Sequence, residues 1–320
     1  MKAIGGYFCL EQPPVQGSYI HEKGIHLNSG RNALEYILRS LTNIQCLWIP
    51  YYTCDVVLEP LKKLGIPYRF YSVNEYLELT DKIELGENDF LLATNYFGIM
   101  DAYIKKLAFR YGERLIVDNA QAFFAEPIRA IKTIYSPRKF VGIPDGGIAY
   151  IENGFDISKL EQDISYDRCS HLLKRLDLGA EAGYVDFREN SHKLVNQPVK
   201  RMSNLTWNLL QGIDLDWVKK QRRENFNQLH EALSEINQLQ ILDMDTFACP
   251  MVYPFCTSDD TLKKHLIEKK IFVATYWPNV LGSCKDNMIE YELANKVIAI
   301  PIDQRYEKKE MEYIIKIVKK

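Results

Sequence analysis

The sequence has no long hydrophobic run, no excess of either charge, and no apolar leader. Its 320 residues carry 40 basic and 42 acidic side chains, so the formal net charge is −2. A chain so close to neutral gives no electrostatic reason to expect nucleic acid or an acidic membrane surface as a partner. No apolar stretch approaches the roughly 18 residues that span a bilayer, and the opening residues lack the apolar run of a signal peptide.

Paired cysteines are also missing. The seven cysteines lie apart, without a C-x-x-C motif. Scattered cysteines of this kind are typical of a reducing compartment, so we expect a cytoplasmic protein. His21 and His26 are five residues apart, and Cys249 and Cys256 are seven apart. Neither spacing matches a zinc site, and no metal is expected.

The sequence does contain an alternation of strand-like and helix-like segments. Near-continuous hydrophobic runs, the pattern of strands covered on both faces, occupy 46–50, 68–73, 89–98, 114–120, 133–136 and 147–151. Between the strands, 29–41 has helical periodicity with Asn28 or Ser29 as a possible N-cap. Residues 55–65 are also helical, with Pro60 as an interior penalty. The alternation predicts an α/β fold with a mostly parallel sheet.

The pattern changes after residue 215. A long amphipathic helix is predicted over 217–236, with Val218, Phe226, Leu229, Leu233 and Ile236 on or near one stripe. Short strand candidates follow at 251–255, 271–277 and 297–302, and the chain ends in an amphipathic helix. We therefore predict two domains, a larger α/β domain over 1–215 and a smaller α+β domain over 216–320.

Three short stretches carry side chains suited to chemistry. Asp118 ends a buried apolar run, and ligands bind at the carboxyl ends of strands in open parallel sheets. Taken alone, Asp118 is better explained by a helix cap or an ion pair with an arginine. The turn "NSGRNAL" opens a capped helix, whose free N–H groups and dipole suit a phosphate. Lys139 lies in a polar loop one strand later, and taken alone it is an ordinary surface lysine.

Together the three stretches match the parts that hold pyridoxal phosphate (PLP). A helix N-terminus binds the phosphate, a carboxylate pairs with the pyridine nitrogen, and a lysine joins the aldehyde. The local sequences resemble the DegT/StrS-type sugar aminotransferases of the fold-type I (aspartate aminotransferase-like) superfamily. The matching stretches are "LNSGRNAL", "IPYYTCDVV", "NYFG", "LIVDNAQAFF", "YSPRKFVGIPDGG", "RMSNLTWNLL", "RRENFNQL" and "IPIDQRY". The resemblance implies a three-layer large domain that binds PLP and a smaller C-terminal domain.

The resemblance also implies roles for individual residues. Asp118 would hold the pyridine nitrogen, Gln121 would meet the phenolic oxygen, and Lys139 would bond to the cofactor. The phosphate would be bound by Gly30, Arg31, Asn32 and the hydroxyl of Ser136. Cys54 stands where the family often has an aromatic residue that stacks on the cofactor ring, and Tyr51, Tyr52 or Tyr96 are alternatives for that face.

The resemblance implies a PLP-dependent aminotransferase that takes an amino-acid donor and a nucleotide-linked keto sugar. Arg138, Arg201 and Arg305 are candidates for binding a carboxylate or diphosphate. Another PLP enzyme on the same fold, such as a lyase or an acyl transferase, is one alternative, and a catalytically idle ligand-binding protein is another. In the family's dehydratases a histidine replaces the lysine, so Lys139 argues against that reaction.

The resemblance further implies a homodimer whose active site is completed across the interface. The apolar segment "NYFGIMDAYI" would help to line that interface. Val199 stands at the place of the asparagine that usually reaches the neighbouring subunit's phosphate.

Overall fold

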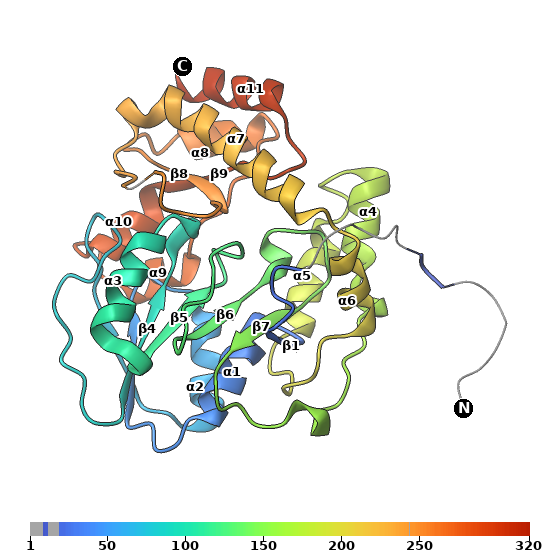
Figure 1. The fold of residues 1–320 in the computed structure, drawn as a ribbon. Helices are drawn as coiled ribbons and strands as arrows, with labels where there is room; N and C mark the ends of the chain where they lie inside the picture. Colours follow the sequence, from blue (N-terminus) through green and yellow to red (C-terminus); the bar gives the residue numbers. More distant parts are fainter. Residues whose placement is uncertain (1–8, 12–18, 243) are drawn as a thin grey trace.

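The structure is a computed structural model that describes residues 9–11, 19–242 and 244–320. Its larger part is a seven-stranded sheet covered by helices (Figure 1). The strand order is β1-β7-β6-β5-β4-β2-β3. Strands β2 to β6 are mutually parallel, whereas β7 runs antiparallel to both of its neighbours. The strands span Ile25–Leu27 (β1), Cys46–Pro50 (β2), Tyr68–Tyr71 (β3), Asp89–Thr94 (β4), Leu115–Asn119 (β5), Lys132–Tyr135 (β6) and Gly147–Tyr150 (β7).

Successive residues of the central strands pack into two separate cores, one on each face of the sheet. Ile116 belongs to a cluster with the buried side chains of helices α1 and α2. Its neighbour Val117 belongs to a second cluster, which includes the buried side chains of α3. Because side chains alternate across a strand, Asp118 faces the α1 side. These helices span Gly30–Ser40 (α1), Leu58–Leu64 (α2) and Asp101–Tyr111 (α3).

Two helices after β7 are barely buried. In α4 (Ser170–Leu178) only His171 is buried, and in α5 (Tyr184–Lys193) only Asn190 is. They lie beside α6 (Asn204–Gln211) at one flank of the sheet (Figure 1). Most of their apolar side chains therefore face outward.

The last third of the chain packs around a small antiparallel sheet of β8 (Val252–Cys256) and β9 (Val297–Pro301). Helices α7 (Leu215–Leu233) and α11 (Lys308–Val318) lie side by side at the top of the molecule (Figure 1). One core cluster contains side chains from both sides of residue 215, and the division into two domains there stays a prediction. The remaining helices span Leu262–Glu268 (α8), Pro278–Ser283 (α9) and Ile289–Lys296 (α10).

The α/β fold with a mostly parallel sheet is confirmed, and several local predictions are corrected. Residues 271–277 form no strand, because only Ala274 makes a bridge, with Ala299. Pro60 lies in the first turn of α2, where a missing N–H costs little. Ile236 is 48% exposed, because α7 ends at Leu233. In the described residues no helix is long and apolar enough to cross a membrane.

Candidate active site

Asp118 lies at the carboxyl end of β5, as the sequence predicted. Its side chain is buried, and it accepts the N–H of Ala120 at 2.8 Å. Burial raises the pKa of this carboxyl group, and the nearby positive charge of Lys139 opposes the rise. No arginine pairs with it among the described residues. The carboxylate is therefore free to pair with a cationic group of a ligand.

The start of α1 approaches the end of β6. Ser29 caps α1 by accepting the N–H of Asn32 at 3.2 Å. A Cβ atom added to Gly30 would lie 3.3 Å from the Cβ of Ser136 and 3.5 Å from its hydroxyl. The positive end of the α1 dipole and a buried hydroxyl therefore meet at one point, as an anion site requires.

The glycine pair after the lysine loop allows β7 to pass close to this helix start. A Cβ atom on Gly147 would lie only 2.0 Å from the carbonyl oxygen of Ser29. Gly146 has φ +107° and donates its N–H to the Asn28 carbonyl at 3.0 Å. Any side chain at Gly147 would push the α1 start away from Ser136.

The side chains of Arg31 and Asn32 are occupied inside the subunit. Nη1 of Arg31 lies 2.5 Å from the carboxylate of Glu59. The Asn32 side chain accepts from the Ser29 hydroxyl at 2.5 Å and donates to the Gln197 carbonyl at 2.9 Å. Any contribution of these two residues to a phosphate site would come from the helix start that they stabilise.

Gln121 is the clearest sign that this region can hold a ligand. Its side chain is 1% exposed, and its Oε1 accepts the N–H of Phe97 at 2.8 Å. Its Nε2 is buried and has no hydrogen-bond partner in the part of the chain that is described. An unpaired buried donor is costly. An acceptor such as the phenolic oxygen of PLP would satisfy it.

Lys139 lies close to both Asp118 and Cys54. It ends a short turn, Pro137–Lys139, and donates its backbone N–H to the Ser136 carbonyl at 3.2 Å. Its positive charge lowers the pKa of the Asp118 carboxyl and of the Cys54 thiol, although burial raises both overall. The structure thus brings together the carboxylate, the lysine, and the residue expected at the face of a cofactor ring.

Each of the three tyrosines proposed for that face packs against another aromatic ring. Tyr51 stacks on Phe70, with ring centroids 4.8 Å apart. Tyr52 and Tyr96 are buried, and the centroids of their rings lie 5.3 Å apart. The Tyr96 hydroxyl also donates to the Tyr52 carbonyl at 2.8 Å.

Sequence reasoning missed Tyr276. Burial and the neighbouring Cys54 thiol raise the pKa of the Tyr276 hydroxyl to about 12. No spacing in the sequence connects position 276 with position 54, because the contact depends on how the C-terminal part packs on the sheet.

Each of the three candidate arginines has a hydrogen-bond partner within the chain. Arg201 donates its Nε to the Leu160 carbonyl at 3.1 Å, and Arg305 pairs with Asp303 at 2.6 Å. Arg138 is held by the hydroxyl of Ser191 at 3.1 Å. Burial lowers the pKa of Arg138, and the nearby charge of Arg31 lowers it further.

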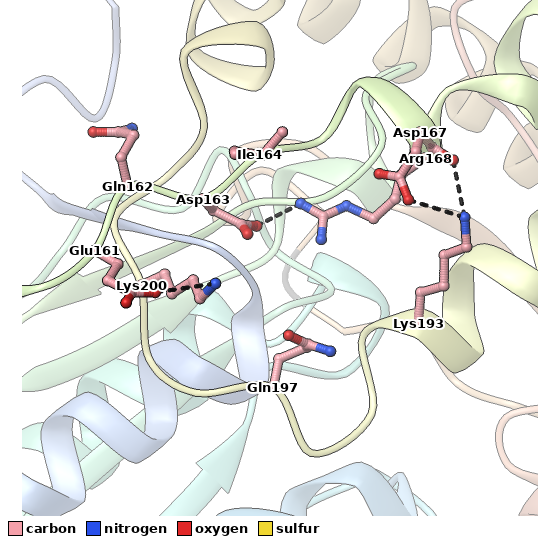
Figure 2. Close-up of a pocket in the computed structure, with 9 residues that line it drawn as sticks. All are labelled: Glu161, Gln162, Asp163, Ile164, Asp167, Arg168, Lys193, Gln197 and Lys200. Atoms are coloured by element: carbon pink, nitrogen blue, oxygen red, sulfur yellow. Dashed lines mark hydrogen bonds and ion pairs between the residues drawn. The ribbon is translucent and has the colours of Figure 1, made fainter.

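A cavity of about 670 Å³ lies beside this region (Figure 2). Its basic side chains have acidic partners: Lys193 pairs with Asp167, Lys200 with Glu161, and Arg168 with Asp163. A second cavity, of about 540 Å³, has Val117 and Asn119 in its lining and so opens on the α3 face of the sheet. Neither is lined by Asp118, Gln121 or Lys139.

No protein-family model matches the sequence, and no curated protein matches it significantly. Solved structures match over most of the chain. DesV of S. venezuelae, in complex with a ketimine intermediate, has 18% identity and a TM-score of 0.63, with 92% of this chain and 83% of that chain covered. A DegT DnrJ EryC1 StrS aminotransferase from Brucella abortus has 14% identity and a TM-score of 0.62, with 92% and 85% covered.

This chain has the fold of the DegT/StrS sugar aminotransferases. A third structure of this fold is the GDP-4-keto-6-deoxymannose-3-dehydratase ColD with bound GDP-perosamine, at 14% identity and a TM-score of 0.62, with 92% of this chain and 88% of that chain covered. The resemblance read from the motifs is thereby confirmed for the fold. At such low identities the comparisons concern the fold, and the chemistry must be argued from the side chains.

Proposed function

We propose that the protein is a PLP-dependent aminotransferase. The observation that carries the proposal is the buried, unpartnered Nε2 of Gln121, three residues after Asp118, whose carboxyl group is influenced by the charge of Lys139. The start of α1 and Ser136 add a place for a phosphate group. This set of groups fits the pyridine nitrogen, the phenolic oxygen, the aldehyde and the phosphate of PLP.

PLP, when bound, supplies a protonated ring that withdraws electrons from the carbon losing a proton. Asp118 would pair with the pyridine nitrogen and favour its protonated form, since a buried carboxylate is stabilised by a cation beside it. Lys139, once displaced from the aldehyde carbon by the amino donor, would carry the proton from the donor's Cα to the cofactor's C4′, acting first as a base and then as an acid. Gln121 would donate to the phenolic oxygen, and Ser136 with the α1 start would hold the phosphate.

For the acceptor we propose a keto sugar linked to a nucleotide. Support comes from the shared fold with sugar aminotransferases and with ColD, whose structure contains GDP-perosamine. Lys139 favours amino transfer over dehydration, because the family's dehydratases carry a histidine in its place. The amino donor is an amino acid, and Arg138, the residue before Lys139, is the candidate partner for its carboxylate.

The half-reaction with an amino donor tests this function without knowledge of the acceptor. Purified protein loaded with PLP should lose its visible absorption band when L-glutamate or another amino donor is added. The band should return when a keto acid is supplied. A protein that binds PLP but keeps its band with every amino acid tried would instead favour the idle ligand-binding alternative.

We also propose that the protein is a cytoplasmic homodimer. The segment expected at the interface is not available for it, because Tyr96, Phe97 and Ile99 are buried within the subunit. A better surface is formed by α4 and α5, which we call the α4–α5 face. Its exposed apolar residues are Leu173, Leu176, Leu178, Tyr184, Val185 and Phe187, between 44% and 83% exposed.

The α4–α5 face adjoins the lysine loop. Asn190 donates its side-chain amide to the Pro144 carbonyl at 2.7 Å, and Ser191 contacts Arg138. A second subunit that covers this face would therefore pack next to the proposed cofactor site. Apolar patches of this extent mark association surfaces.

A further inference from the structure

The proposed cofactor site lacks an aromatic residue at position 54. Cys54 is half-buried there, and its thiol is too small to cover a pyridine ring. Tyr51 packs on Phe70, and Tyr52 packs on Tyr96 and Trp277. An aromatic side chain from another part of the fold would have to cover the ring.

The segment that begins at Tyr276 is fixed against the residues preceding Cys54. The ring of Trp277 lies 5.1 Å from that of Tyr52. The side chain of Asn279 donates to the Thr53 carbonyl at 2.9 Å. Two anchors therefore hold positions 277 and 279 beside positions 52 and 53, and they bring Tyr276 to the Cys54 side chain.

The Tyr276 ring also borders the other proposed cofactor contacts. It lies 6.1 Å from the ring of Phe97, whose N–H is bonded to Gln121. The buried guanidinium of Arg222 is also near Tyr276, because its charge lowers the pKa of the Tyr276 hydroxyl. Arg222 donates at 3.0 Å to the carbonyl of Phe140, the residue after Lys139. Tyr276 thus has one neighbour that contacts Gln121 and another that contacts the residue after Lys139.

We propose that Tyr276 supplies the aromatic face that position 54 lacks, and that its ring packs on the pyridine ring of the cofactor. This inference rests on the proposed function, because it assumes that PLP binds at Asp118 and Lys139. Aromatic rings prefer offset or edge-to-face contact with another π-system. A consequence is that the C-terminal part of the chain completes a site whose other groups come from the sheet.

The test is the dissociation constant of PLP, measured by titration of the bound absorption band. Tyr276→Ala should weaken PLP binding roughly 3- to 10-fold, the usual value of an aromatic contact. Tyr276→Phe keeps the ring and should bind within about twofold of wild type. Tyr313→Ala, at a 47% exposed tyrosine of α11, is the matched control and should leave binding unchanged.

A second pair of variants tests the same point from position 54. In the Tyr276→Ala background, Cys54→Trp should restore PLP affinity, because the indole ring at position 54 can cover the face of the pyridine ring that Tyr276 no longer covers. In the wild-type background the same Cys54→Trp change should weaken binding, since two rings would compete for one face. The opposite signs give a coupling that general loss of stability cannot produce, and the melting temperature of each variant reports its folding.

The outcomes separate the inference from the proposed function. Wild-type protein that does not bind PLP would overturn both. If Tyr276→Ala bound PLP as tightly as wild type, the inference alone would be overturned. The same would follow if Cys54→Trp changed the PLP affinity in the same direction in both backgrounds.

Discussion

The carboxyl edge of the large sheet and the α4–α5 face are incomplete in opposite ways. At the sheet edge, the Nε2 of Gln121 is a polar group buried without a partner. On the α4–α5 face, Leu176 is an apolar group left 83% exposed. Both arrangements are unfavourable as they stand, since a buried donor needs an acceptor and an apolar surface gains by leaving water. The first therefore points to a small polar ligand, and the second to a protein partner.

The difference also shows in how each region is built. The sheet edge is held by close backbone contacts, such as that between Gly147 and Ser29, and leaves little freedom to its side chains. The α4–α5 face is attached by a few side-chain hydrogen bonds, among them the one from Asn190 to Pro144. A ligand should therefore bind at the sheet edge with little rearrangement of the protein. The α4–α5 face, by contrast, should be stabilised when a second subunit packs on it.

The largest expected effect concerns the charge at the sheet edge. Asp118→Asn should reduce the rate of the half-reaction on the order of 10²- to 10³-fold, the usual loss when one preorganised electrostatic group is removed. The neutral amide cannot keep the pyridine nitrogen protonated, although PLP should still bind through its phosphate. Stopped-flow absorbance with a competent amino donor measures the rate.

Asp89→Asn is the control for this change, because Asp89 lies at the opposite edge of the sheet, where β4 begins. It should leave the rate unaltered. If Asp118→Asn reacted as fast as wild type, Asp118 would have only a structural role, and the sheet edge would lose its interpretation as a catalytic site.

Close packing at the sheet edge is tested by Gly147→Ala. The new Cβ would lie 2.0 Å from the Ser29 carbonyl oxygen, so the free energy of unfolding should fall by about 1–3 kcal/mol, as for other overpacked sites. PLP binding should weaken as well, because the α1 start would move. Urea unfolding of the apoprotein gives the first quantity.

Gly282→Ala is the matched control. A Cβ there meets nothing within 4 Å, and the residue lies in α9. The change should be neutral or stabilising by up to about 1 kcal/mol. If both substitutions lowered the free energy of unfolding by the same amount, the backbone contact at Gly147 would not be tight.

The partner surface is tested by Leu176→Glu. A charge in the middle of the α4–α5 face should weaken the dimer roughly tenfold or more, since burying an unpaired carboxylate is costly. Analytical ultracentrifugation over a range of concentrations follows the dissociation. Phe109→Glu provides the comparison, because Phe109 is 96% exposed on α3 and far from this face. If the wild-type protein were a monomer, or if the two changes weakened the dimer equally, the α4–α5 face would not be the dimer interface.

Not every unpartnered buried polar atom marks a ligand site, as the buried histidine His26 shows. The smallest predicted effect concerns this residue and His21. Nε2 of His26 has no partner among the residues that the structure describes, but it lies in an aromatic cluster with Tyr19 and Trp207. Burial lowers the pKa of both His21 and His26 to about 4, from an ordinary value of 6.5. Both are therefore neutral in the folded protein.

As the pH falls, the two histidines take up protons in the unfolded chain before they do so in the folded protein. The free energy of unfolding is therefore highest above pH 6.5 and decreases as the pH falls toward 4. We expect the two histidines to account for a loss on the order of 1–2 kcal/mol between pH 7 and pH 6. Urea unfolding at the two pH values measures it. His21→Gln should reduce the pH dependence, whereas His192→Gln, at an exposed position, should not.

Much of the sheet edge could be predicted from the sequence, because it depends on local patterns. The apolar run before Asp118, the cap before Gly30 and the glycines after Lys139 each specify a strand end or a helix start within a few residues. Tyr276 could not be predicted, since its place depends on how the C-terminal part packs against positions 52 to 54. The short strand β1 was missed as well, because its three residues pair only at the edge with β7.

The α4–α5 face was equally hidden in the sequence. Leucines spaced along a helix normally indicate a buried stripe, and only the packing shows that α4 buries none of them. Periodicity identifies an apolar face, but it does not say whether the face is covered by the same chain.

The central claim is that Lys139 bonds to PLP, and covalent trapping tests it most directly. Protein loaded with PLP is reduced with borohydride, digested, and mapped by mass spectrometry. The account predicts that the cofactor is attached to the peptide containing Lys139. Lys132 is an internal control, because its Nζ donates to the Glu113 carbonyl at 2.6 Å, at the opposite end of β6. Attachment at Lys132 or at another lysine, or undiminished trapping in Lys139→Ala, would contradict the account.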